Sequence, residues 1–229
     1  MRRRAALTLP LLAVGCAQSP PSREQALPAL PSLLDQAPPA GGRLWKADAT
    51  ASLLRIVAFR GGAAARLGHH HILQAEDFKA ALWLPDSGLA GAQGELRVRL
   101  DALQIDAPAW RAAAGGEFNE KPVGPEAIAG TRSNLLKALE AAAHPEVRLQ
   151  LLNLSGAAPW WIAALRLNLA GRAADYRVAL AVAQTPERLR LQGRIALRHS
   201  DHGLAAFSLL GGLLAVQDGV VLELDLQLR

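Results

Sequence analysis

Hydrophobic and polar residues alternate one by one along much of this sequence. Near the C-terminus, Leu222, Leu224, Leu226 and Leu228 fall on one face of an extended chain, with polar residues between them. The same period, or an apolar run of strand length, recurs in the stretches 52–59, 78–84, 94–100, 145–154, 161–171 and 187–198. Short turns such as 184–187 and 217–219 separate them. The pattern predicts about eight half-buried antiparallel strands, as in a barrel or a sandwich.

One stretch departs from this alternation. Leu135, Leu136, Leu139 and Ala142 recur at helical spacing, and Pro145 is expected to end the helix. We therefore expect one helical excursion of about 40 residues between positions 107 and 144, placed as a lid across one end of the strands.

The N-terminus has the pattern of a secretory signal. Three arginines at positions 2–4 precede an apolar stretch at 5–14, and small residues then lead to Cys16, the only cysteine. This order resembles the cleavage box of bacterial lipoproteins, in which Cys16 is lipidated, although Ala13 stands where such boxes usually have leucine. The alternative is a plain secreted protein with a spare thiol.

This interpretation divides the chain into three parts. Residues 1–15 are predicted as a signal peptide, residues 16–41 as a lipidated, proline-rich tether and residues 42–229 as the folded domain. Six of the fourteen prolines lie in the predicted tether. Because proline fixes φ and removes a hydrogen-bond donor, we expect this segment to be extended rather than packed.

Net charge and the composition of side chains exclude several function classes. The formal charge is +5, but removal of the signal takes away three arginines and no acid, which leaves +2 without a basic block. Nucleic acid is therefore not an expected partner. The sequence His199-Ser-Asp-His202 contains triad residue types, but neighbours in sequence do not form triad geometry. Phosphate loops and nucleophile elbows are missing, so we expect no enzyme.

Several motifs occur in a characteristic order. Gly68 and the histidines at 69–71 follow the first predicted strand, and Asp106 and Arg111 follow a later one. In this order the chain resembles the YceI-like family of periplasmic proteins; Leu135 stands where that family has methionine. Further segments similar to the family are 78–82, 134–150, 167–180 and 199–224.

The resemblance implies a fold and a ligand class. The expected fold is mainly β: a single antiparallel, eight-stranded lipocalin-like barrel with an apolar cavity. The family binds isoprenoid chains such as polyprenyl phosphates or quinones. An eight-stranded barrel is just wide enough for one small ligand, and each buried CH₂ group of a prenyl tail gains roughly 0.8 kcal/mol.

The histidine run has three interpretations. In a strand, His69 and His71 share a face. They are either part of the fold's own signature, or contacts to a polar head group, or metal ligands together with His199 or His202. A neutral histidine can donate a hydrogen bond to a phosphate or quinone oxygen. The residues expected to bind the ligand are His69, His71, Trp110, Arg111 and Phe207.

The sequence therefore predicts a non-enzymatic, periplasm-facing lipoprotein that transports, stores or scavenges an isoprenoid-tailed or quinone-like amphiphile. No cofactor is expected besides this bound lipid. Ala17 after the cysteine favours the outer membrane by analogy with lipoprotein sorting, and the acyl chains would be the contact with the membrane. Two alternatives remain: a metal-binding protein, and an accessory protein of a membrane complex with no ligand. The sequence leaves the oligomeric state open, a homodimer included.

Overall fold

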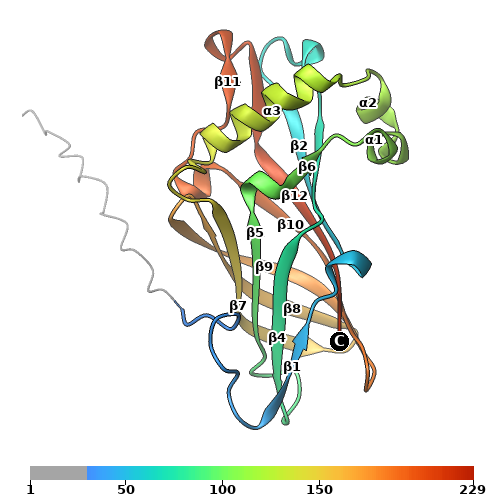
Figure 1. Ribbon diagram of the computed structural model, residues 1–229, viewed down its shortest axis with the longest axis vertical. Helices are drawn as coiled ribbons and strands as arrows, with labels where there is room; N and C mark the ends of the chain where they lie inside the picture. The colour runs from blue at the N-terminus through green and yellow to red at the C-terminus, as the bar shows by residue number, and fades with distance from the viewer. Residues whose placement is uncertain (1–29) are drawn as a thin grey trace, which may run out of the picture.

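The protein is described by a computed structural model that covers residues 30–229 (Figure 1). The predicted signal peptide, Cys16 and the first part of the predicted tether lie outside these residues. The strands are β1 (Gly42–Lys46), β2 (Leu53–Gly61), β3 (His71–Ala75), β4 (Phe78–Pro85), β5 (Gln93–Arg99), β6 (Leu103–Ile105), β7 (Glu146–Ala157), β8 (Trp160–Leu169), β9 (Arg172–Gln184), β10 (Leu189–Arg198), β11 (Ser208–Leu209) and β12 (Leu214–Leu228).

All strand pairs are antiparallel and belong to one curled sheet. Its order is β1-β4-β5-β7-β8-β9-β10-β12-β2-β3-β6, with β11 added beside β12. The expected mainly β, lipocalin-like barrel class is confirmed, but the described residues form twelve strands rather than eight. Eight of them have seven residues or more, and the four short ones are β1, β3, β6 and β11. These short strands have two to five residues, which is too few for an alternating pattern to reveal them.

The sheet closes on itself through its two short terminal strands. At one end, Lys46 of β1 and Arg229 exchange two backbone hydrogen bonds of 3.0 Å, which join β1 to the end of β12. At the other end, β6 continues from β5 and pairs with β3. Backbone pairing thus links β1 to the end of β12, and at the other edge the chain itself links β5 to β6.

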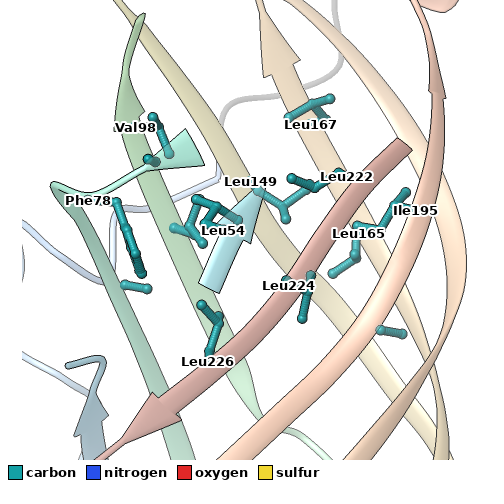
Figure 2. Packing of buried hydrophobic residues seen from close by; sticks show 14 of the residues in the cluster. Leu54, Phe78, Val98, Leu149, Leu165, Leu167, Ile195, Leu222, Leu224 and Leu226 are labelled. Atoms are coloured by element: carbon teal, nitrogen blue, oxygen red, sulfur yellow. The ribbon is translucent and has the colours of Figure 1, made fainter. Parts of the chain in front are cut away.

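Alternating leucines fill the interior. Leu222, Leu224, Leu226 and Leu228 of β12 are buried, as their spacing predicts, and they face leucines from β2, β7 and β8 (Figure 2). Trp83 of β4 is buried in the wall, not at the cavity. The predicted strand stretches therefore supply the core.

The helical excursion is present as three helices. They are α1 (Pro108–Ala114), α2 (Gly116–Asn119) and α3 (Pro125–Ala138), and α3 crosses one end of the curled sheet (Figure 1). The helix ends four residues before Ala142, because Glu140 takes a left-handed conformation with φ 52°. Within residues 30–229, every helix falls short of the length and hydrophobicity needed to cross a membrane.

Residues 30–35 of the predicted tether lie against the sheet. The Leu33 amide donates a 2.7 Å hydrogen bond to the Glu95 carboxylate, and Arg97 donates one of 2.6 Å to the Ser32 hydroxyl. Arg148 donates to the Leu30 carbonyl oxygen, and Gln150 donates to that of Pro31. The proline content did not predict this contact, because the partners come from the outer faces of β5 and β7.

Candidate functional site

A cavity of about 220 Å³ opens inside the curled sheet beneath α3. Most of its wall consists of apolar side chains, leucines above all. From α3 it receives Thr131, Asn134, Leu135 and Ala138, which are spaced so that they share one helix face. The predicted lid is thus a wall of the cavity.

Histidines concentrate at the α3 end of this cavity. The strand registers place His71, Ala58, Val220 and Leu197 side by side across β3, β2, β12 and β10, and all four line the cavity. His199 follows Leu197 by two residues and lines the cavity as well. The cavity therefore has leucines in depth and imidazoles near one end.

His71 is held by a buried carboxylate. Its Nδ1 lies 2.6 Å from Oδ2 of Asp106, whose side chain is fully buried. The other oxygen of Asp106 accepts hydrogen bonds from the Ile72 amide at 2.9 Å and from the Arg111 guanidinium at 2.9 Å. Burial acts to raise the pKa of Asp106, but the hydrogen bonds from His71 and the Ile72 amide and the charge of Arg111 outweigh it, so this pKa lies below its ordinary value.

This contact fixes the tautomer of His71. An ionised carboxylate only accepts hydrogen bonds, so Nδ1 of His71 carries the proton, and Nε2 of the neutral ring is an acceptor. Among residues 30–229 no hydrogen bond to Nε2 is formed. We expected that a neutral histidine could donate to a ligand oxygen; for His71 that donation requires the ionised ring, and the neutral ring instead accepts from a ligand hydroxyl.

Two further histidines of the cavity have the same tautomer. Nδ1 of His199 lies 2.8 Å from the Asp218 carbonyl oxygen, and Nδ1 of His202 lies 3.0 Å from that of Arg172. Carbonyl oxygens only accept, so both rings carry their proton on Nδ1. Nε2 of His202 already pairs with the Tyr176 hydroxyl at 3.1 Å. Burial lowers the pKa of His202, which keeps this ring neutral, and raises the pKa of Tyr176 to about 12.

His69 and His70 lie outside the cavity lining. β3 begins only at His71, and His70 is buried in the opposite direction, with Nε2 at 2.7 Å from the Glu117 carboxylate. The His70 ring also contacts the Phe118 ring, with centroids 5.0 Å apart and the planes tilted by 39°, so it attaches α2 to the sheet. The His69 ring lies 6.5 Å from that of His71, and burial lowers the pKa of His69.

The other predicted ligand residues separate into two groups. Phe207 lines the cavity, together with His71. Trp110 and Arg111 of α1 do not line it. The Arg111 side chain is buried and donates to Asp106 and to the His70 carbonyl oxygen, so its charge is directed at the fold rather than at an anionic head group.

The four histidines of the metal alternative do not gather around a common point. In the part of the chain that the structure describes, no group of three or more His, Cys, Asp or Glu side chains is placed to hold a metal ion. The Nδ1 atoms of His71, His199 and His202 are already engaged.

Sequence reasoning missed the polar contribution of α3. Thr131 and Asn134 line the cavity, and the Asn134 side chain makes no hydrogen bond to any of residues 30–229. Their spacing from Leu135 and Ala138 was a usable signal, because positions i, i+3, i+4 and i+7 share a helix face.

Comparisons with known proteins give a likeness in fold. No family model and no curated protein matches the sequence. A crystal structure of Burkholderia cenocepacia BcnA matches with a TM-score of 0.56 at 12% identity, over 79% of this chain and 98% of that one. The Campylobacter jejuni YCEI protein matches with a TM-score of 0.47 at 11% identity, over 68% of this chain and 82% of that one. The likeness to BcnA, a YceI-like protein, shows a YceI-like fold.

Proposed function

We propose that this protein binds one amphiphile, whose apolar tail occupies the cavity beneath α3 and whose head lies near His71. The observation that carries the proposal is a cavity lined mainly by leucines, with imidazole groups at one end. An apolar pocket with a few convergent polar groups is the usual form of a small-molecule site. The isoprenoid class of the tail comes from the resemblance of the sequence to the YceI-like family.

The cavity size supports a tail of this kind. An apolar cavity of about 150 Å³ stays dry and binds benzene, and this one has about 220 Å³. Its inner part therefore suits the end of a prenyl chain, while the remainder of the chain extends toward α3. Each CH₂ group that leaves water stabilises the complex by roughly 0.8 kcal/mol.

The tautomer of His71 favours a head group that donates a hydrogen bond. With Nδ1–H directed to Asp106, Nε2 accepts from a hydroxyl. We therefore propose a hydroxyl-headed isoprenoid, such as a prenyl alcohol or a quinol, over a quinone or a phosphate.

The cellular setting belongs to the same proposal. The signal pattern and Cys16 support a lipid-anchored protein that faces the periplasm and carries or stores its ligand without chemistry. The ligand-free accessory protein is the second candidate, and the experiment below separates the two.

A wall substitution tests binding directly. Ala58→Phe adds a large side chain next to His71 inside the cavity, and Ala196→Phe adds the same group on the exposed face of β10. We expect native mass spectrometry with geranylgeraniol to show one ligand per chain for the parent and for Ala196→Phe, and none for Ala58→Phe. Circular dichroism of both variants confirms folding. Equal binding by all three proteins, or binding by none, contradicts the proposal.

A matched ligand pair tests the head group. Geranylgeranyl methyl ether has the same tail as geranylgeraniol but no donor. We expect the alcohol to bind about fivefold more tightly, since the value of one hydrogen bond is about 1 kcal/mol, and we expect His71→Phe to abolish the difference. If the parent binds both ligands equally, the head-group assignment is wrong while the tail site remains.

A further inference from the structure

Four exposed leucines lie on two neighbouring loops at the α3 end of the molecule. Leu67 follows β2 and is 65% exposed. Leu209 ends β11, Leu210 and Leu213 follow it, and these three are 48%, 72% and 48% exposed. Both loops are at the upper end in Figure 1. We call these four residues the apolar tip. Leucines are ordinarily found singly on a surface, and a group of them indicates an interaction site.

The two loops are joined by backbone contacts. The Ala64 amide donates a 2.8 Å hydrogen bond to the Leu213 carbonyl oxygen. Gly62 packs so closely that an added Cβ would lie 2.5 Å from the carbonyl oxygens of Gly212 and Leu213. The apolar tip is therefore one surface and not two separate loops.

The charge around the apolar tip is positive on balance. Neither 61–75 nor 203–217 contains an acidic residue. Exposed Arg66 lies beside Leu67, and the amine of exposed Lys121 donates to the Arg66 carbonyl oxygen at 3.0 Å. The nearby carboxylates of Glu117 and Glu120 lie 3.0 and 3.8 Å from the Arg60 guanidinium, which offsets part of their charge.

The apolar tip is continuous with the cavity. Phe207 lies two residues before Leu209 and lines the cavity, as does Val216, whose amide donates a 2.9 Å hydrogen bond to the Phe207 carbonyl oxygen. A surface that contacts the apolar tip therefore lies at the same end as the polar part of the cavity.

We propose that the apolar tip docks on an anionic lipid bilayer and inserts its leucines below the head groups. Apolar side chains next to cations are the pattern of proteins that bind at a membrane interface. A stable protein interface buries roughly 800 Å² on each partner, whereas the apolar tip consists of two turns. The inference of docking is based on these leucines and charges. Its role, the transfer of a ligand between the bilayer and the cavity, rests on the proposed function.

Vesicle sedimentation tests the docking. The chain of residues 30–229 contains every described element and lacks Cys16, so no acyl anchor contributes. The tip variant carries Leu209→Ser, Leu210→Ser and Leu213→Ser. The control variant carries Trp160→Ser and Ile162→Ser, which are 66% and 52% exposed on the hairpin of β7 and β8, at the other end of the strands. The vesicles contain phosphatidylethanolamine and phosphatidylglycerol.

We expect the parent and the control variant to sediment with these vesicles and the tip variant to partition at least tenfold less. We also expect Arg66→Gln with Lys121→Gln to weaken sedimentation several-fold on anionic vesicles but not on pure phosphatidylcholine. Geranylgeraniol binding in solution should be unchanged in the tip variant, which shows that it is folded. A parent that does not sediment, or a tip variant that sediments like the parent, overturns the docking. So does a tip variant that changes only the oligomeric state. Vesicle binding without geranylgeraniol binding would instead refute the proposed function alone.

Discussion

At the residue scale, Asp106 is the centre of the histidine site. Its carboxylate accepts from His71, Arg111 and the Ile72 amide while its side chain is fully buried. It thus orients the ring at the cavity and compensates a buried guanidinium at the same time. Removal of one partner from a buried ion pair is costly because the other charge stays behind.

We therefore expect Asp106→Asn to lower the free energy of unfolding by about 3 kcal/mol, since it leaves Arg111 without its counter-ion. Urea denaturation monitored by circular dichroism measures the change. The control is Asp101→Asn, which removes an exposed ion pair with Arg99 and should change stability little. Equal effects of the two substitutions would contradict this account.

His202 makes stability depend on pH. Burial lowers its pKa in the folded protein, whereas in the unfolded chain a histidine titrates near pH 6.5. Below about pH 6.5 the unfolded chain therefore binds more protons, and stability falls as the pH decreases. His69 acts in the same direction. We expect the free energy of unfolding to fall less between pH 7.5 and 5.5 in His202→Gln than in the parent, as measured by urea denaturation. An equal fall in both proteins would mean that other groups cause the pH dependence.

At the element scale, α3 combines a useful face with a weak backbone. Its cavity stripe includes Thr131, Asn134 and Leu135, yet it has no side-chain N-cap and contains Gly130 in its interior. Most of its stability must then come from packing on the sheet.

Gly130→Ala should raise the free energy of unfolding by about 0.5–1 kcal/mol, because it removes backbone freedom from the unfolded chain. A Cβ at this position meets open space. Gly62→Ala is the opposite case, since Gly62 has φ +87° and carbonyl oxygens 2.5 Å from the added carbon. Thermal unfolding of both variants checks the pair, and a destabilised Gly130→Ala would show that α3 has a contact not described above.

Single elements were predictable from the sequence, whereas contacts between elements were not. The alternation along β12 predicted its buried leucines, and helical spacing predicted α3, because both signals repeat within one element. The partnership of His71 with Asp106 joins residues 35 positions apart, and no local period records it. Trp110 and Arg111 were assigned to the ligand from residue type, whereas α1 directs Arg111 into the fold.

At the scale of the whole molecule, the folded unit begins before residue 42. Glu95, with its side chain fully buried, accepts from Arg97 at 2.6 Å, from Arg148 at 2.7 Å and from the Leu33 amide at 2.7 Å. Burial acts to raise the pKa of Glu95, but its hydrogen bonds with Arg148 and Arg97 outweigh this and lower it. Residues 30–35 therefore complete a polar cluster on the outside of the sheet.

We expect a chain that begins at residue 36 to be less stable than one that begins at residue 30 by roughly 2 kcal/mol, since several hydrogen bonds of about 1 kcal/mol each are lost. A chain that begins at residue 41, which keeps the Gly41 carbonyl oxygen that accepts from the Asp86 amide, should match the one that begins at 36. Urea denaturation of the three chains gives the comparison. Equal stability of all three would mean that this contact contributes nothing.

The central claim is that the cavity beneath α3 holds the tail of one amphiphile. The most direct measurement is native mass spectrometry of the chain with geranylgeraniol, alongside Ala58→Phe and Ala196→Phe. The account predicts one bound ligand for the parent and for Ala196→Phe and no bound ligand for Ala58→Phe. A parent without ligand, or a ligand retained when Ala58→Phe fills the cavity, would contradict it.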